Sequence, residues 1–276
     1  MHAGHALSAI LAHDMARDLG GRFLVRIEDI DVARARPEFV DAIFEDLAWL
    51  GLTWEQPVLI QSQHFADYLA AADKLIAQGL LYPCFASRAD LVAAATRPAV
   101  ADPDGGPLYP SLWKNASQQA VAERIARGEA PALRLDMDAA MRVAHAKLGD
   151  TPLTFTEIDA DGHALAIDAE PERWGDAIII RKDVPASYNL AVVVDDARQG
   201  VTHVTRGEDI LQATGLQRLL QVLLDLPEPL YYHHRLIRWQ DGRKLSKCNS
   251  DMGLRALRAE GATPSDICQA IGLIRA

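Results

Sequence analysis

The sequence has few cysteines, no long hydrophobic run and no excess of positive charge, and each absence excludes a class of protein. Its three cysteines, Cys84, Cys248 and Cys268, are odd in number and widely spaced, which argues against a disulfide framework and favours a reducing compartment. No stretch approaches the roughly 18 consecutive apolar residues of a membrane span, and the first residues lack the basic and then apolar order of a signal peptide. We therefore expect a cytoplasmic protein without a membrane partner.

The charge balance limits how the chain could bind a nucleic acid. Its 276 residues include 38 acidic and 28 basic side chains, a formal charge of −10, so a nucleic acid would have to meet a local basic surface. One segment has seven basic residues against Asp241 and Asp251: Arg235, Arg238, Arg243, Lys244, Lys247, Arg255 and Arg258. Taken alone, this segment fits a solvated basic face as well as a binding surface.

Helical and strand-like segments alternate along the chain. Apolar residues at helical spacing predict helices over residues 6–19, 37–51, 64–78 and 211–224. Short apolar runs predict buried strands over residues 23–27, 177–180, 190–194, 201–204 and 231–237. This alternation predicts an α/β fold with a Rossmann-like, doubly wound parallel sheet.

One stretch interrupts the pattern. Residues 96–111 are dense in proline and glycine and cannot form a regular element, so they mark an inserted α+β subdomain. We expect four segments: the first half of the core over 1–81, the insertion over 82–170, the second half of the core over 171–240, and a loop with a helical segment over 241–276. There is no internal repeat and no low-complexity tail.

The first residues read His2-Ala3-Gly4-His5. In the first turn of a helix, the spacing of His2 and His5 puts both imidazoles on one face, with Cβ atoms about 5–6 Å apart. The unpaired N–H groups and the positive end of the helix dipole point the same way, and Gly4 lets a phosphate approach the backbone. Such a turn suits the triphosphate of ATP, although two histidines near a terminus also fit plain exposed residues.

A second candidate is the turn Asp241-Gly242-Arg243-Lys244-Leu245-Ser246-Lys247, which carries closely spaced cations. A mobile loop of this kind can bring Lys247, with Lys244 beside it, onto the charge that develops between the α-phosphate and pyrophosphate. Alone, it also fits a solvated loop.

With both motifs present in this order, the chain resembles the glutamyl-type class I aminoacyl-tRNA synthetases. Residues 2–5 are similar to the HIGH signature of that family and residues 244–248 to its KMSKS signature. The resemblance extends from His2 to about Ser250, and it implies catalytic roles for His2, His5, Lys244 and Lys247 and ATP binding by His2, Gly4, His5 and Lys247.

The resemblance also implies a glutamate pocket. Glu28, in the run over residues 26–31, matches the glutamate that holds the substrate amino group, and Tyr188 matches the tyrosine that lines the pocket. Arg206 matches the arginine that binds the substrate side chain, and its planar fork suits a carboxylate. Separately, these residues also fit a surface acid, a core aromatic and a member of a structural ion pair.

The expected acceptor of the glutamyl group depends on the sequence after the KMSKS-like residues 244–248. A glutamyl-tRNA synthetase continues into a large helical anticodon-binding domain, whereas this chain ends 28 residues after Cys248. This is the pattern of the glutamyl-queuosine tRNA(Asp) synthetases, which activate L-glutamate with ATP and transfer it to the queuosine base of tRNA(Asp). The implied partners are L-glutamate, ATP with Mg²⁺, and queuosine-bearing tRNA(Asp), and we expect a monomer.

Members of the family often hold zinc in the insertion, and this chain departs from that pattern. Cys84 and Tyr109 match two of the four ligand positions, but Ala86 and Trp113 occupy the others. Structural zinc normally takes four ligands, so we expect no metal there.

A second departure concerns the start of the chain. The family has a strand and an Arg-x-x-Pro-Ser-Pro-Thr-Gly loop before its HIGH turn, and only Met1 precedes His2 here. We therefore expect the first strand of the sheet to be missing, with lower stability. A start codon placed too far downstream would explain it. Two alternatives stay open: a non-catalytic remnant that binds ATP or tRNA, and another HIGH-type nucleotidyltransferase.

Overall fold

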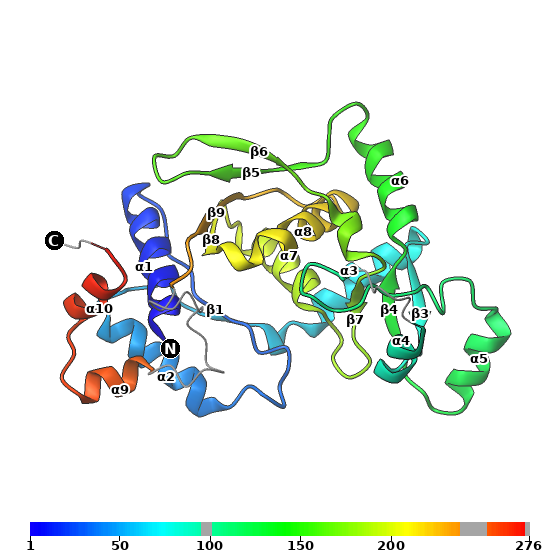
Figure 1. The fold of residues 1–276 in the computed structure, drawn as a ribbon, viewed down its shortest axis with the longest axis horizontal. Coiled ribbons are helices and arrows are strands. Elements are labelled where there is room, and N and C mark those ends of the chain that lie inside the picture. Colours follow the sequence, from blue (N-terminus) through cyan, green and yellow to red (C-terminus); the bar gives the residue numbers. More distant parts are fainter. Residues whose placement is uncertain (95–100, 238–252, 274–276) are drawn as a thin grey trace. The chain divides into compact units, whose positions relative to one another are not determined.

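The computed structural model describes residues 1–94, 101–237 and 253–273 (Figure 1). The chain folds into two compact units, the first made of Met1–Ser62, Val204–Ile210 and Tyr232–Ala276, and the second of Gln63–His203 and Leu211–Tyr231. The loop with Lys244 and Lys247 lies outside the described residues. The four segments expected from the sequence stay a prediction.

The first unit contains α1 (Ala3–Asp18), β1 (Arg26–Ile27), α2 (Pro37–Trp49), β2 (Leu59–Ile60), α9 (Leu254–Ala259) and α10 (Pro264–Ala270). The helices expected over 6–19 and 37–51 are confirmed. Pro37 begins α2, where its missing N–H has no helical partner to lose, and Gly51 follows the helix at φ +74°. The helices share one apolar core: Ala6, Leu7, Ile10, Leu47, Leu50, Leu52, Leu254, Ile267, Cys268 and Ile271.

The second unit begins at the last residue of the short helix η1 (Gln61–Gln63). It contains α3 (Phe65–Ala77), β3 (Leu81–Cys84), α4 (Arg88–Ala94), α5 (Gln118–Ala126), β4 (Ala132–Leu135), α6 (Met137–Leu148), β5 (Thr154–Ile158), β6 (Ala164–Asp168), η2 (Pro171–Trp174), β7 (Ile178–Ile180), α7 (Tyr188–Gln199) and α8 (Leu211–Leu224). Strands β3, β4 and β7 form an antiparallel sheet in that order. The expected helices over 64–78 and 211–224 and the expected strand over 177–180 are confirmed.

Two further strands pass from one unit to the other, β8 (His203–Gly207) and β9 (Leu230–His234). In the second unit β5 pairs antiparallel with β6 and parallel with the start of β9, where Glu157 faces Tyr231. In the first unit β9 lies beside β8. The strands expected over 201–204 and 231–237 are therefore present, the first of them shifted toward Gly207.

The strand expected over 190–194 is wrong, because these residues lie inside helix α7. The Ser187 side chain caps the helix by accepting a hydrogen bond from the Leu190 backbone N–H, and Gly200 ends it in the left-handed conformation at φ +63°. A run of β-branched valines favours a strand when read alone. Here Val192 and Val193 are buried in a helix that packs against α3 and α8, so tertiary burial overrides the local preference.

The strand expected over 23–27 is shorter than predicted. Only Arg26 and Ile27 form β1, which pairs in parallel with Leu59 and Ile60. The preceding residues 23–25 line an apolar cavity. The α/β class and a parallel pairing in the core are nevertheless as expected.

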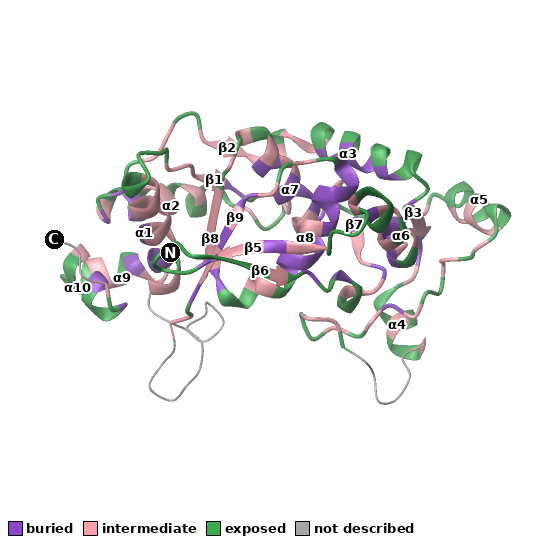
Figure 2. Cartoon of the chain, turned by 90° about the horizontal axis from the view of Figure 1, so that it is seen from above, coloured by how far each residue is buried: buried purple, intermediate pink, exposed green. Residues whose placement is uncertain are grey.

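Helix α8 carries the core of the second unit, as the buried residues in Figure 2 show. Gly215 lets it approach the backbone between β6 and η2 closely, because a Cβ added there would lie 1.6 Å from the carbonyl oxygen of Ala169. Among the described residues, none of the helices is long and apolar enough to cross a bilayer.

Candidate functional site

Helix α1 begins with its two histidines in mutual contact. His2 is the N-cap, and its Nδ1 accepts a hydrogen bond from the Gly4 backbone N–H at 3.1 Å. The His2 backbone N–H donates to His5 Nδ1 at 3.2 Å, and the two imidazole centroids are 3.7 Å apart. The rings therefore share one face of the first turn, as their spacing predicts.

Gly4 keeps room for this arrangement. A Cβ on Gly4 would lie 2.9 Å from Cε1 of the His2 ring, which is closer than real Cβ atoms approach. A side chain at position 4 would displace the His2 imidazole from the cap. Gly4 therefore leaves room for the His2 ring, in addition to leaving room for a phosphate near the backbone.

The same turn opens onto a cavity of about 440 Å³ in the first unit. Its wall includes His2, Gly4 and His5 from α1, and Arg206 from β8. The dipole of α1 directs partial positive charge toward its N-terminus, and Arg206 adds a full cation. Arg235 adds a second cation to the wall and Asp209 adds one carboxylate, so the charges of these side chains sum in favour of an anionic ligand.

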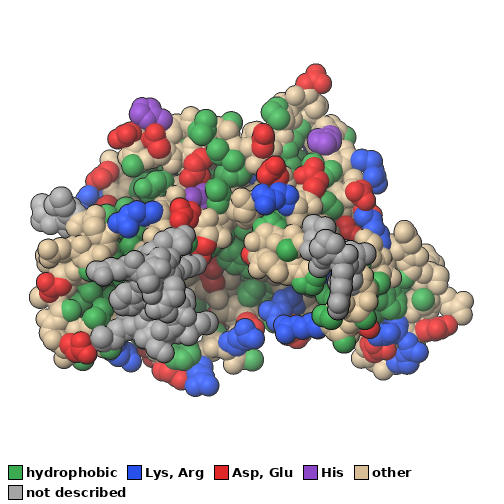
Figure 3. Space-filling model, in the orientation of Figure 1, with side chains coloured by type: hydrophobic (Ala, Val, Ile, Leu, Met, Phe, Trp, Pro, Cys, Tyr) green, Lys and Arg blue, Asp and Glu red, His purple; other side chains and the backbone are tan. Residues whose placement is uncertain are grey.

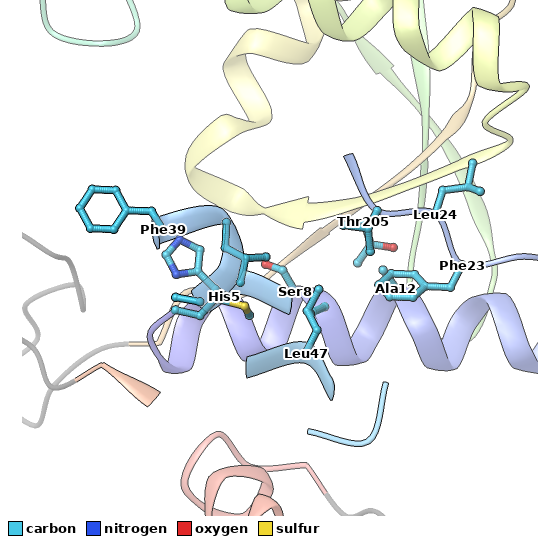
Figure 4. Close-up of a pocket in the computed structure, with 13 residues that line it drawn as sticks. His5, Ser8, Ala12, Phe23, Leu24, Phe39, Leu47 and Thr205 are labelled. Atoms are coloured by element: carbon cyan, nitrogen blue, oxygen red, sulfur yellow. The ribbon is translucent and has the colours of Figure 1, made fainter. Parts of the chain in front are cut away.

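A second and more apolar cavity of about 620 Å³ lies along α1 (Figure 4). His5, Ser8 and Ala12 of α1 face it together with Phe23, Leu24 and, from α2, Phe39 and Leu47. His5, Ser8 and Thr205 line both cavities. These three residues therefore separate the smaller cavity, which has charged residues in its wall, from the larger and more apolar one.

Two histidines of β9 connect the elements around the smaller cavity. His234 is buried, and its Nε2 lies 2.7 Å from Ser8 Oγ of α1, while its Nδ1 lies 2.9 Å from the Arg235 carbonyl oxygen. His233 Nε2 accepts a hydrogen bond from Arg206 Nε at 3.1 Å. Ser8, His233 and His234 were not singled out from the sequence. The available signal was the pair of histidines near the end of a predicted strand, shortly before Lys244 and Lys247.

The other two expected glutamate ligands, Glu28 and Tyr188, are not among the residues that line the smaller cavity. Glu28 follows β1, is 41% exposed, and lies 3.4 Å from Arg26 Nη2. Its neighbour Asp29 accepts hydrogen bonds from the Ser62 backbone N–H at 2.8 Å and from Ser62 Oγ at 2.6 Å, which anchors the segment after β1. Tyr188 is the first residue of α7, in the second unit. The structure thus groups His2, Gly4, His5 and Arg206 around one cavity, without Glu28 in its wall.

The expected basic surface is partly neutralised where the structure describes it. Arg255 and Arg258 of α9 both pair with Glu45 of α2, at 2.6 and 3.5 Å, and Arg235 donates to the Ile271 carbonyl. Outside the grey residues, the face in Figure 3 intersperses basic with acidic side chains. Arg238, Arg243, Lys244 and Lys247 lie outside the described residues.

The residues at the expected zinc position do not fit that metal. Cys84 Sγ donates to the Tyr109 hydroxyl at 3.3 Å, and the same oxygen accepts from the Trp113 backbone N–H at 2.8 Å. Burial, together with the Cys84 hydrogen bond, raises the pKa of the Tyr109 phenol well above its usual value. Trp113 and Phe85 meet edge to face with ring centroids 4.9 Å apart, and the Arg124 guanidinium lies over both. Two donors, one of them a protonated phenol, cannot replace four ligands.

We expect the purified protein to carry less than about 0.1 zinc per chain, because structural zinc needs about four ligands. Elemental analysis measures this directly, and a chelator should leave the unfolding temperature unchanged. About one zinc ion per chain, whose removal by the chelator lowers the unfolding temperature, would contradict the prediction.

One other group of potential metal ligands occurs among the described residues. Asp159, Asp161 and His163 lie together in the exposed turn between β5 and β6. His163 Nδ1 already contacts Asp159 Oδ2 at 3.0 Å. Exposed acidic turns of this kind are common without a metal, and this one belongs to the second unit.

Comparison with known proteins agrees with the α/β fold described above. Residues 1–275 match the family described as tRNA synthetases class I (E and Q), catalytic domain. A glutamyl-Q tRNA(Asp) synthetase of Rhodobacter capsulatus is 44% identical over 99% of this chain and 96% of its own length. Another from Symbiobacterium thermophilum is 38% identical over 97% of this chain and 80% of its own length.

A solved structure shows the same fold in a longer protein. The glutamate-tRNA synthetase of Elizabethkingia anophelis superposes with a TM-score of 0.68 over 95% of this chain, at 21% identity. This chain spans about half of that protein, 52% of its length. With the family match over nearly all of its residues, the chain belongs to the catalytic-domain family of the class I (E and Q) tRNA synthetases and is an aminoacyl-tRNA synthetase-like ligase.

Proposed function

We propose that this protein activates L-glutamate with ATP and transfers it to the queuosine base of tRNA(Asp). The observation that carries the proposal is the grouping of His2, Gly4, His5 and Arg206 around one cavity at the N-terminus of α1. Family membership supports the reaction class, and two relatives named glutamyl-Q tRNA(Asp) synthetase, matched over most of their length, support the acceptor.

ATP would bind with its phosphates at the α1 turn. The helix dipole favours negative charge there, and the paired imidazoles lie at the same turn. Mg²⁺ typically binds through substrate phosphates and few protein carboxylates, and when bound it would neutralise charge on the departing pyrophosphate. Among the described residues, Asp209 is the one carboxylate in the cavity wall, beside Arg206 and Arg235, so the protein offers few carboxylates to the ion.

Glutamate would bind through two of its charged groups, which leaves its α-carboxylate free to react. In the proposal, Arg206 holds the side-chain carboxylate, Glu28 holds the ammonium group, and Tyr188 lines the pocket. An α-carboxylate oxygen then attacks the α-phosphorus, the bond to pyrophosphate breaks, and glutamyl-adenylate forms. The acceptor base next attacks the activated carbonyl carbon, and AMP leaves. Lys244 and Lys247 would stabilise the charge that develops on the phosphates.

Two assays on the full chain test the proposal. Glutamate-dependent exchange of labelled pyrophosphate into ATP should occur without tRNA, and labelled glutamate should appear on tRNA(Asp) that carries queuosine. Transfer should be absent on the same tRNA lacking queuosine. Binding of ATP or tRNA with neither exchange nor transfer would instead identify a non-catalytic remnant.

Replacing Lys247 by alanine should reduce exchange by about 10²- to 10³-fold, the usual effect of removing one donor to transition-state charge. Glutamate binding, measured by calorimetry, should stay within about two-fold, because the lost interaction acts on phosphate charge rather than on the amino acid. Equal losses of binding and exchange would show that its role is misassigned.

A further inference from the structure

One hydroxyl in the wall of the smaller cavity is hydrogen-bonded to a buried histidine. Ser8 lies three residues after His5 on α1 and lines both cavities (Figure 4). Its Oγ lies 2.7 Å from Nε2 of His234, which is 4% exposed, and 3.3 Å from the carbonyl oxygen of Gly4. The ring nitrogen is therefore the nearer acceptor for the hydroxyl proton.

The second ring nitrogen of His234 decides what Nε2 can do. Nδ1 lies 2.9 Å from the Arg235 carbonyl oxygen, which can only accept a hydrogen bond, so Nδ1 carries a hydrogen. In the neutral ring Nε2 then has a lone pair, and Ser8 donates to it. A hydroxyl, a base within hydrogen-bond reach and a third group that orients the base are the usual parts of a site that removes a proton from oxygen.

The other two histidines described in this wall are the opposite tautomer. His2 Nδ1 accepts from the backbone N–H of Gly4 at 3.1 Å, and His5 Nδ1 accepts from the backbone N–H of His2 at 3.2 Å. Each neutral ring therefore has its hydrogen on Nε2, which can donate to a phosphate oxygen but has no lone pair for a proton. Of these three histidines, His234 is the one whose Nε2 can act as a base.

The second step of the proposed reaction needs a base, and the first does not. Glutamyl-adenylate forms by attack of an ionised carboxylate, which has no proton to lose. In the transfer, the attacking group of the acceptor must lose a proton as it bonds to the carbonyl carbon. The base must therefore lie within reach of the place where the adenylate forms, and Ser8 lines the cavity assigned to the nucleotide phosphates.

We propose that Ser8 and His234 relay the proton that the acceptor loses during transfer. As the acceptor bonds to the carbonyl carbon, its proton passes to Ser8 Oγ while the Ser8 proton passes to His234 Nε2. The bond from the carbonyl carbon to AMP breaks, and its electron pair leaves with the AMP oxygen. His234 then returns its proton through Ser8 to the departing AMP, which restores the pair. The proposal rests on the proposed function and extends it, because it assigns the base for the second step.

Two assays with the full chain separate the steps. Pyrophosphate exchange measures adenylate formation, and single-turnover transfer from preformed adenylate to queuosine-bearing tRNA(Asp) measures the second step. Ser8→Ala should slow transfer about 10²-fold more than it slows exchange, because general-base catalysis contributes about 10²- to 10⁴-fold. Ser8→Thr keeps a hydroxyl and should recover most of the lost transfer rate.

The pH dependence of transfer tests His234 as the final proton acceptor. A protonated His234 cannot accept, so the ratio of transfer to exchange in the wild type should fall as the pH is lowered through the range in which histidine titrates, about pH 8 to 5. His234→Gln removes the base, so it should lower the ratio at neutral pH and abolish this fall.

Other titratable or charged groups share this wall, and the ratio of the two rates separates their effects. They lie on α1, on β8, in the turn after β8 and directly after β9: His2, His5, Arg206, Asp209 and Arg235. A group that acts on the phosphates changes exchange as well as transfer, so it leaves the ratio nearly unchanged. Asp209→Asn tests the one carboxylate described in this wall as the alternative base.

His203→Ala is the control variant. His203 lies on β8, contacts Thr202 Oγ1 at 2.9 Å and is not among the residues that line the cavity, so the ratio should stay that of the wild type. Thermal unfolding of every variant shows whether it is folded.

The outcomes separate this proposal from the function on which it rests. Wild-type protein that exchanges pyrophosphate but transfers no glutamate would overturn the proposed acceptor, and the relay with it. Transfer by the wild type, with equal losses of exchange and transfer in Ser8→Ala, would give Ser8 a structural role and overturn only the relay. A selective loss of transfer in Asp209→Asn but not in Ser8→Ala would also overturn the relay, because the base would then be Asp209.

Discussion

Arg206→Ala should raise the KM for glutamate by about one hundred-fold, with the KM for ATP nearly unchanged. Removing a charge-assisted hydrogen bond costs about 1.5–3 kcal/mol, and the substrate carboxylate would remain in the cavity without its cation. At about 1.4 kcal/mol for each ten-fold change, a loss near 3 kcal/mol corresponds to roughly a hundred-fold weaker binding. Exchange kinetics at varied glutamate, at saturating ATP, measure the effect.

Arg206→Lys is the matched variant for this prediction. It keeps the positive charge but loses the planar fork and the Nε–H that donates to His233. We expect a KM for glutamate between those of the wild type and the alanine variant. A lysine variant equal to the wild type would mean that charge alone is recognised, and an alanine variant equal to the wild type would remove Arg206 from the glutamate site.

Gly215→Ala should destabilise the protein by at least about 3 kcal/mol, which places it among the most damaging single substitutions. The added Cβ would lie 1.6 Å from the Ala169 carbonyl oxygen and 2.7 Å from its carbonyl carbon. Both are backbone atoms, so no side chain can rotate away, and α8 is buried on nearly every side. The helix would have to shift from η2, exposing the apolar core of the second unit.

Thermal or urea unfolding measures this effect, with Gly21→Ala as the control. Gly21 is exposed, and a Cβ there would lie 3.5 Å from the Ala16 carbonyl oxygen, an ordinary contact. The control should therefore change the stability by less than about 0.5 kcal/mol. A Gly215→Ala protein as stable as the control would mean that α8 and η2 are less closely packed than the structure has them.

Four helices were predictable because their signals are local. The apolar spacing, Pro37 and the terminating glycines act within one or two turns, and α1, α2, α3 and α8 formed where the sequence predicted them. Helix α7 was mispredicted as a strand over residues 190–194, since a run of valines favours a strand until neighbours enclose it. The Ser187 cap and Gly200, which bracket the helix, were the local signals that could have corrected the prediction.

The contacts of the candidate site also fall into local ones, which were predictable, and long-range ones, which were not. The contact of His2 with His5 was predictable, because residues three apart on a helix share a face whatever surrounds it. The partner of Arg206 was not predictable, because His233 is 27 residues away and meets it only when β8 and β9 lie side by side. Ser8 and His234 are 226 positions apart, and only packing of α1 near β9 joins them.

The sequence by itself determined the family resemblance, the chemistry of the α1 turn, and the mismatch of residues 84, 86, 109 and 113 with a four-ligand zinc site. These depend on residue identity and on spacing within single elements, which short-range geometry converts directly into shape. Only the tertiary structure decided that Arg206 donates to His233, that α8 needs a glycine against Ala169, and that the valines of α7 are helical. Those outcomes depend on which distant segments pack together, and burial and long-range hydrogen bonds then outweigh local preference.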